Sequence, residues 1–211
     1  MGDFFNKSLR EIIELSASSA PVPGGGSISA IVACLGATMT AMVCNLTAGK
    51  EKYRDVESLV REINNSLSSL LTKLENLVEE DMAEFQHFMT AYRLPRETEE
   101  QKAVREEALQ RALRGSTEIP LEIARTCLMI LQLTQQLAGI GNKMAISDAG
   151  VAATVTEAAL NSVLLTASSN VPLIKDNGYA ERVAAEIASL TDEAGQIKEK
   201  IMNVVRERMK N

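Results

Sequence analysis

The stretch that most restricts the possible fold is residues 27–49, which contains no charged side chain. A helix of this length is long enough to cross a lipid bilayer. The stretch is, however, rich in Ala, Ser and Thr rather than Leu and Ile, and it includes Gly36. Helices that are apolar on all sides are buried, and small side chains allow other helices to approach closely. We therefore expect the central buried helix of a soluble bundle, with membrane insertion as the alternative.

Apolar residues recur every three or four positions through most of the remaining chain, and strand signals are almost absent. The repeat is clearest over residues 54–93, which would be about 60 Å long as one straight helix, so we expect a bend there. Other helices are expected at residues 5–18, 98–114, 116–138, 147–168 and 178–209. The pattern predicts a single all-α domain over residues 1–211, a bundle of about seven helices.

Composition excludes several classes of function. The chain carries 22 Lys and Arg against 28 Asp and Glu, whereas a general nucleic-acid binder needs a basic face. One histidine excludes an HExxH metal site, and three cysteines without a CxxC pair match neither a zinc knuckle nor a disulfide scaffold. Residues 1–5 lack the basic start of a signal peptide. We expect a cytoplasmic protein that uses no metal and binds neither nucleic acid nor membranes.

One loop is unusual for a plain helical bundle. Gly24, Gly25 and Gly26 stand directly before Ser27, which we expect to cap the following helix. Three glycines expose backbone N–H groups at a helix start, where the helix dipole favours anions. A tight turn needs only one glycine, so this loop is a candidate ligand site. The alternative is a flexible or closely packed turn.

A second loop brings Asn142 and Lys143 close to Ser147 and Asp148. Asp148 heads the inward-facing stripe of the next predicted helix. The alternative reading is that Ser147 and Asp148 only cap that helix.

Asp81 is a third anomaly, because it occupies the apolar stripe of residues 54–93. Burial there would raise its pKa and make it a candidate acid. The alternative is that Asp81 and its neighbouring glutamates form one solvated acidic shoulder.

Several blocks of the sequence together resemble one known family. The block APVPGGGS at positions 20–27 is followed by a small-residue helix that ends in CNLTAGK at positions 44–50. Further blocks agree: Asp81 with AYRLPR at positions 91–96, IPL at positions 119–121, and Gly141-Asn142 with Ser147-Asp148 and Asn170. This pattern resembles the formiminotetrahydrofolate cyclodeaminase / methenyltetrahydrofolate cyclohydrolase family. Thr166 and Ala167 stand where the family often has Asn and Val, which affects the expected substrate preference and not the fold.

The resemblance implies an all-α homodimer with its active site near the subunit interface. It also implies a reduced folate substrate, with or without a polyglutamate tail, and one of two activities. A cyclodeaminase converts 5-formiminotetrahydrofolate to 5,10-methenyltetrahydrofolate and ammonia, and a cyclohydrolase converts the 5,10-methenyl compound to 10-formyltetrahydrofolate. Both reactions pass through a tetrahedral carbon and need one group that gives and takes a proton. Neither needs a cofactor.

With this resemblance, Asp148 is the expected acid/base. Asp81 is the second catalytic candidate, either as a proton partner or as a carboxylate that binds the pterin amino edge. The expected substrate-binding residues are Gly24, Gly25, Gly26, Ser27, Ser147, the amides Asn45, Asn142 and Asn170, and, for an anionic glutamate tail, Lys50, Lys52 and Lys143. The competing hypothesis is a non-catalytic helical binding protein, which leaves the three glycines and Asp81 unexplained.

Overall fold

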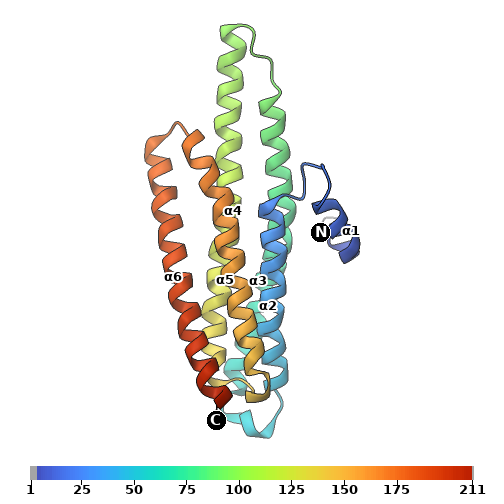
Figure 1. The fold of residues 1–211 in the computed structure, drawn as a ribbon, viewed down its shortest axis with the longest axis vertical. Coiled ribbons are helices and arrows are strands. Elements are labelled where there is room, and N and C mark those ends of the chain that lie inside the picture. The colour runs from blue at the N-terminus through green and yellow to red at the C-terminus, as the bar shows by residue number, and fades with distance from the viewer. Residues whose placement is uncertain (1–3, 211) are drawn as a thin grey trace.

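The computed structural model describes residues 4–210, and no strand occurs among them (Figure 1). Residues 1–3 and 211 lie outside the described residues, as does part of the segment compared with a signal peptide. The α-helices of the described part are α1 (Leu9–Ser16), α2 (Gly25–Thr47), α3 (Glu57–Tyr92), α4 (Glu99–Ile140), α5 (Ile146–Asn170) and α6 (Asn177–Lys210). Short 3-10 turns occupy Phe4–Asn6, Glu51–Val56, Lys143–Ala145 and Val171–Leu173. The predicted all-α bundle is confirmed, with six α-helices in place of about seven.

The difference in helix number comes from α4. We expected a helix to end at Gly115, but α4 continues through Gly115 and contains Pro120 in its interior. A Cβ on Gly115 would lie 2.0 Å from Glu84 Oε2, so this glycine makes room for a side chain of α3. Pro120 lacks an N–H, which frees the Ser116 carbonyl four residues earlier. That carbonyl accepts a hydrogen bond from Asn170 Nδ2 at 3.0 Å, and the helix therefore tolerates the proline.

The prediction that the long apolar segment bends is wrong for the helix itself, because the irregular turn lies before α3. The 3-10 turn Glu51–Val56 contains a non-helical residue, Tyr53, and α3 then runs without interruption from Glu57 to Tyr92. The upper parts of α3 and α4 extend beyond the other helices as a two-helix hairpin (Figure 1).

Helix α2 packs between α3 and α5, and successive long helices alternate in direction (Figure 1). Its buried side consists largely of small residues. A Cβ on Gly36 would lie 2.3 Å from Thr156 Oγ1 and 3.2 Å from the backbone nitrogen of Thr156. The absence of a side chain at Gly36 therefore permits α2 and α5 to approach each other closely.

The opposite side of α2 is open. Leu35 is 57 % exposed on α2, and Leu165 is 72 % exposed on the neighbouring α5. By length and composition alone, Gly25–Thr47 and Lys143–Leu173 are each apolar enough to cross a membrane, and about half of each stretch is buried inside the bundle. Core helices of soluble proteins meet the same criteria. The central helix is thus buried on the side that faces the bundle and exposed on the other.

Gly36→Ala tests the close contact between α2 and α5. The added methyl group meets the Thr156 backbone, which cannot move aside, and we expect a loss of roughly 1–3 kcal/mol in the free energy of unfolding. The matched control is Gly195→Ala in the middle of α6, where a Cβ meets nothing within 4 Å. There we expect a gain of about 0.5–1 kcal/mol from helix propensity. Chemical denaturation measures both changes, and equal stability of the two variants would contradict the close contact.

Candidate active site

A pocket of about 230 Å³ opens where the glycine loop meets α3, α4 and α5. Its wall combines exposed backbone, aromatic rings and small polar groups. The described lining residues are Pro21, Val22, Gly24, Gly25, Gly26, Asp81, Phe85, Phe88, Ser116, Pro120, Thr166, Ser169 and Asn170. Asp81 is the one ionisable side chain among these lining residues.

The carboxylate of Asp81 lies against the first turn of α2. Ser27 Oγ donates a hydrogen bond to Asp81 Oδ2 at 2.6 Å. A Cβ on Gly26 would lie 2.3 Å from Asp81 Oδ1, so the carboxylate occupies the space of the missing side chain. The N-cap of α2 is Gly24, which offers no side-chain hydrogen bond, and not Ser27 as expected. Asp81 supplies from α3 the negative charge that the start of α2 lacks.

Two opposing effects act on the pKa of Asp81. Burial raises this pKa above its ordinary value and is the larger effect. Hydrogen bonds from the hydroxyl and the backbone N–H of Ser27 lower it. A carboxyl group whose pKa is raised inside a pocket can both release and accept a proton, which is the requirement for general acid/base catalysis. The alternative of a fully solvated acidic shoulder is wrong for Asp81.

The rest of the wall was largely missed in the sequence. Phe85 and Phe88 follow Asp81 at four and seven residues, so helical spacing places all three on one face of α3. Phe88 also stacks on Tyr92 with ring centroids 6.3 Å apart. In a chain with four Phe, three Tyr and no Trp, this spacing was the available signal. Asn170 was predicted, but its Nδ2 donates to the protein's own Ser116 carbonyl.

The remaining predicted site residues lie at the opposite end of the bundle. Asp148 is in the first turn of α5 and Asn170 is its last residue, and the 22 positions from one to the other correspond to about 33 Å of helix. Seven of the predicted residues are at the Asp148 end: Asn45, Lys50, Lys52, Asn142, Lys143, Ser147 and Asp148. Gly24, Gly25, Gly26, Ser27, Asp81 and Asn170 are at the pocket end. One chain does not bring the two sets together.

The antiparallel arrangement of α2 and α5 explains this separation. A Cβ on Gly25 would lie 3.5 Å from Thr166 Cγ2, which places the start of α2 beside the end of α5. Asn142 Nδ2 donates to the Leu46 carbonyl at 2.8 Å, which places the end of α2 beside the turn before α5. A glycine loop that precedes α2 and an aspartate that begins α5 are therefore held apart by the length of the bundle.

The predicted residues at the far end have identifiable contacts of their own. Asn142 is only 5 % exposed, its N–H donates to Thr47 Oγ1 at 2.8 Å, and its Oδ1 accepts from the Tyr53 hydroxyl at 3.3 Å. Asn142 thus ties three segments together. Asp148 is half-buried and is not the N-cap of α5, because that position is Ala145. Its charge instead lies in the first helical turn, where the helix dipole favours it.

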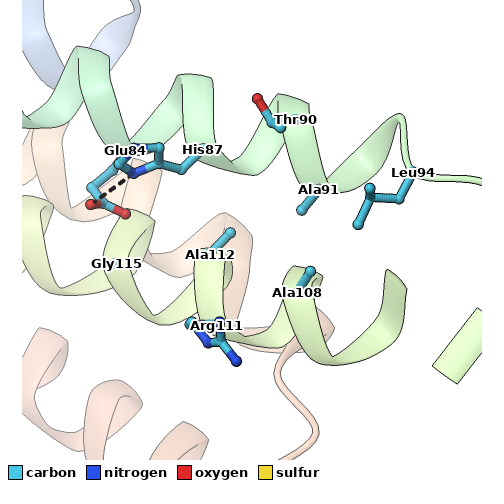
Figure 2. Close-up of a pocket in the computed structure, with 9 residues that line it drawn as sticks. All are labelled: Glu84, His87, Thr90, Ala91, Leu94, Ala108, Arg111, Ala112 and Gly115. Atoms are coloured by element: carbon cyan, nitrogen blue, oxygen red, sulfur yellow. Dashed lines mark hydrogen bonds and ion pairs between the residues drawn. The ribbon is translucent and has the colours of Figure 1, made fainter. Parts of the chain in front are cut away.

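A larger cavity of about 470 Å³ lies between the extended parts of α3 and α4 (Figure 2). Its ionisable side chains have partners on their own helices. His87 Nδ1 lies 3.3 Å from Glu84 Oε1, and Arg111 pairs with Glu107 at 2.8 Å. Alanines from both helices face this cavity (Figure 2). Among the two cavities, the glycine-loop pocket is therefore the better candidate for proton chemistry.

Residues 8–189 match the family model described as formiminotransferase-cyclodeaminase. The chain is 37 % identical over 204 residues to a methenyltetrahydrofolate cyclohydrolase from Methylorubrum extorquens, a match that covers 97 % of this chain and 98 % of that protein. It is 31 % identical over 189 residues to the formimidoyltransferase-cyclodeaminase of Sus scrofa, covering 90 % of this chain and 35 % of that protein. The chain thus spans about a third of this longer relative.

The fold is also similar to a solved structure. The crystal structure of formiminotetrahydrofolate cyclodeaminase from Thermotoga maritima superimposes with a TM-score of 0.87 at 25 % sequence identity. The superposition covers 96 % of this chain and 98 % of that one.

Asp81→Asn tests whether the buried carboxylate is held at a cost to stability. A carboxyl whose folded-state pKa is raised contributes stability that is fully present below its unfolded pKa, ordinarily 3.8, and that is lost as the pH rises through the folded pKa. At neutral pH we therefore expect the variant to melt at the same or a higher temperature than the wild type. At pH values below the ordinary pKa, the wild type should regain the stability that it loses at neutral pH, so its melting temperature should approach that of the variant.

Thermal unfolding across the acidic and neutral range measures this dependence. Asp192→Asn, which removes an exposed carboxylate from α6, is the matched control. A marked drop in the melting temperature of Asp81→Asn at neutral pH would show that the ionised carboxylate is stabilising and that its pKa is not raised.

Proposed function

The chain belongs to the formiminotransferase-cyclodeaminase family, and from this premise we propose that it is an acid/base enzyme of reduced folates. Its first candidate activity is conversion of 5-formiminotetrahydrofolate to 5,10-methenyltetrahydrofolate and ammonia. The observation on this chain that carries the proposal is Asp81, the one ionisable side chain in the described wall of the glycine-loop pocket.

The reaction needs one group that first accepts a proton from the substrate and then returns it to another atom of the substrate. N10 of the folate attacks the carbon of the protonated formimino group and loses its proton, which leaves a tetrahedral carbon bonded to N5, N10 and an amino group. The amino group then takes a proton, its bond to carbon breaks, and ammonia leaves a methenyl bridge between N5 and N10. Asp81 accepts the proton from N10 and returns it to the amino group. No metal or redox cofactor takes part in these steps.

The rest of the pocket suits the flat ring system of a folate. Phe85 and Phe88 offer aromatic surface on the same helix face as Asp81, and planar rings pack well against such surface. Gly24 and Gly25 have no side chains that would keep the ligand away from the peptide groups. Both features support a substrate whose ring system packs against Phe85 and Phe88 and whose reacting carbon lies near the Asp81 carboxyl.

A specific observation favours a second activity, that of a methenyltetrahydrofolate cyclohydrolase. The relative with that name matches over nearly the whole length of both chains. In this reaction water adds to the methenyl carbon and gives one proton to Asp81. Asp81 then protonates N5 as the bond from carbon to N5 breaks, and the second proton of water is released to solvent as the 10-formyl group forms. The same pocket and the same carboxyl serve both reactions.

Turnover on both substrates tests the proposed activities. Purified protein should change the near-ultraviolet absorbance of methenyltetrahydrofolate or release ammonia from the formimino compound. Asp81→Asn should lower kcat by about 10²–10⁴-fold with a smaller effect on KM, because it removes proton transfer and keeps the shape of the pocket. Asp192→Asn is the control. Silence of folded wild-type protein in both assays refutes the enzymatic proposal, and full activity of Asp81→Asn refutes the role of Asp81.

We propose that the protein is a homodimer and that a second copy covers the outward faces of α2 and α5. No charged side chain occurs on α2, and α5 carries only Asp148 and Glu157. Glu157 faces α6, where Lys198 approaches it at 3.8 Å. The resulting surface includes the exposed Leu35 and Leu165, and a large uncharged surface of this kind is typical of an interface.

The orientation of the second copy follows from the separation of the predicted residues. With a twofold axis in the plane of the face and perpendicular to the helices, each pocket lies beside the Asp148 end of the other copy. Asp148 then reaches the glycine-loop pocket from the other subunit, as a second carboxylate near the cationic carbon. Lys50, Lys52 and Lys143 come with it and can bind the anionic glutamate tail of the folate, including a polyglutamate.

The proposed site is tested by mixing two inactive variants, Asp81→Asn and Asp148→Asn. Random reassociation makes half of the dimers mixed, and each mixed dimer holds one site with both carboxylates, so about a quarter of the wild-type activity should return. Leu35→Glu in both chains places charge on the interface and should prevent recovery and yield monomers in size-exclusion chromatography. If mixed dimers form without recovery, or if Asp148→Asn is fully active by itself, the two-chain site is wrong.

We also propose a cytoplasmic location without nucleic-acid or membrane partners. The cysteines Cys34, Cys44 and Cys127 are all free and buried, which suits a reducing compartment. The formal charge of −6 disfavours general binding to nucleic acids or anionic lipids.

A further inference from the structure

We propose that Ser27 is a positioning residue for Asp81. The sequence had instead suggested that Ser27 contacts the substrate. Its hydroxyl orients the carboxyl of Asp81 toward the pocket, and Gly26 provides the space in which this pair forms. The inference deepens the proposed function, because it concerns the residue to which the proton chemistry is assigned. The arrangement of Ser27, Gly26 and Asp81 can nevertheless be tested without any substrate.

Ser27 is inaccessible to a ligand. It is 0 % exposed and does not belong to the lining of the glycine-loop pocket, whereas Gly24, Gly25, Gly26 and Asp81 do. Its hydroxyl points to α3, where it donates to Asp81 Oδ2 at 2.6 Å. A fully buried side chain that touches the pocket only through a carboxylate acts on the substrate only through that carboxylate.

Most other hydroxyls of α2 bond within their own helix, and the exception, Thr40, pairs with the hydroxyl of Thr134 on α4 at 2.7 Å. Ser29 Oγ donates to the Gly25 carbonyl at 2.7 Å, and Thr47 Oγ1 donates to the Val43 carbonyl at 2.6 Å. This bond to the carbonyl four residues earlier is the ordinary arrangement for serine and threonine inside a helix. Ser27 instead uses its hydroxyl across the bundle, 54 positions along the sequence from its acceptor.

Gly26 completes the arrangement. A Cβ at this position would lie 2.3 Å, 2.7 Å and 2.8 Å from Oδ1, Oδ2 and Cγ of Asp81, so the whole carboxyl group packs flat against the helix start. The backbone N–H of Ser27 also acts on the carboxylate and lowers the pKa of Asp81. The hydroxyl of Ser27 and the missing side chain of Gly26 together restrict the rotation of Asp81.

Few other groups influence Asp81. Helix α2 and the loop before it carry no charge, and the residues that α4 and α5 contribute to the pocket are uncharged. On α3 itself, Glu79 and Glu80 directly precede Asp81 and Glu84 follows one turn later. Glu79 Oε1 accepts a hydrogen bond from the Phe4 N–H at 3.1 Å, and Glu84 packs against Gly115 of α4. The only histidine, His87, pairs with Glu84 at 3.3 Å. Ser27 is therefore the main group that offsets the effect of burial on the ionisation of Asp81.

Ser27→Ala should make the ionised form of Asp81 harder to reach. The loss of one hydrogen bond to a carboxylate should raise the pKa of Asp81 by roughly one unit. Nuclear magnetic resonance of ¹³C-labelled aspartate side chains measures this pKa directly, with Asp81→Asn identifying the resonance. In the enzyme assays, the limb of the pH–rate profile that belongs to Asp81 should move to higher pH by the same amount, and KM should change little.

Ser29→Ala is the matched control, because it removes a neighbouring buried hydroxyl of α2 that bonds only to its own helix. It should leave both the resonance titration and the pH–rate profile unchanged. If Ser27→Ala does not fold, Ser27→Cys keeps nearly the same volume with a weaker donor and should give a smaller shift in the same direction.

The outcomes separate the two proposals. An unchanged Asp81 titration in Ser27→Ala, or an increase of KM without a shift of the pH profile, overturns the role of Ser27. A shifted titration in a protein whose wild type has no folate turnover supports the orientation of Asp81 by Ser27 and overturns the proposed function. A shift of both the titration and the pH profile supports both.

Discussion

The close approach of the α2 backbone to its neighbours is the constraint on which the other features depend. At Gly36 the absence of a side chain brings α2 against the backbone of α5, and at Gly26 it admits a carboxyl group from α3. Larger residues at either position would separate the helices. Small side chains provide little hydrophobic surface, so the stability of this contact comes from tight packing over its length. The same packing fixes the walls of the glycine-loop pocket.

At the start of α2, close packing places the carboxylate of Asp81 against the first helical turn. A helix start leaves backbone N–H groups without partners, and here the N-cap glycine supplies no side chain to satisfy them. Asp81 fills that position from α3, which keeps a carboxylate inside a pocket where burial opposes its charge. A group held between two opposing influences has a proton affinity that small structural changes can adjust. Enzymes commonly keep ionisable groups with shifted pKa values in their active sites, where these groups lower the stability of the fold but serve catalysis.

The direction of the helices has a second consequence. Because α2 and α5 are antiparallel neighbours, each end of the bundle holds one set of the predicted site residues. The pocket end holds the glycines and Asp81, and the far end holds Asp148 with a group of lysines. The uncharged outward surface of α2 and α5 connects the two ends. In the proposed dimer, a second copy in the opposite direction would join the two sets without any change within the chain.

The sequence alone determined the properties that depend on local pattern. The spacing of apolar residues predicted an all-α bundle, the three glycines marked a candidate ligand site, and Asp81 was noticeable because a charge interrupts an apolar stripe. Local signals failed at Gly115 and Pro120, which read as a helix boundary. The tertiary structure supplies a carboxylate for the space at Gly115 and an Asn170 amide for the carbonyl that Pro120 frees, so α4 continues.

Only the tertiary structure decided which candidate residues lie together. Ser27 had been expected as a cap and a substrate contact, yet its partner is a carboxylate on another helix. Asp148 and the glycine loop had been expected in one site, yet about 33 Å of helix separates Asp148 from Asn170 at the pocket end of α5. Periodicity reports which face of a helix is buried, because that depends on neighbouring turns. It does not report which ends of different helices meet, because that depends on the direction in which each helix enters the bundle.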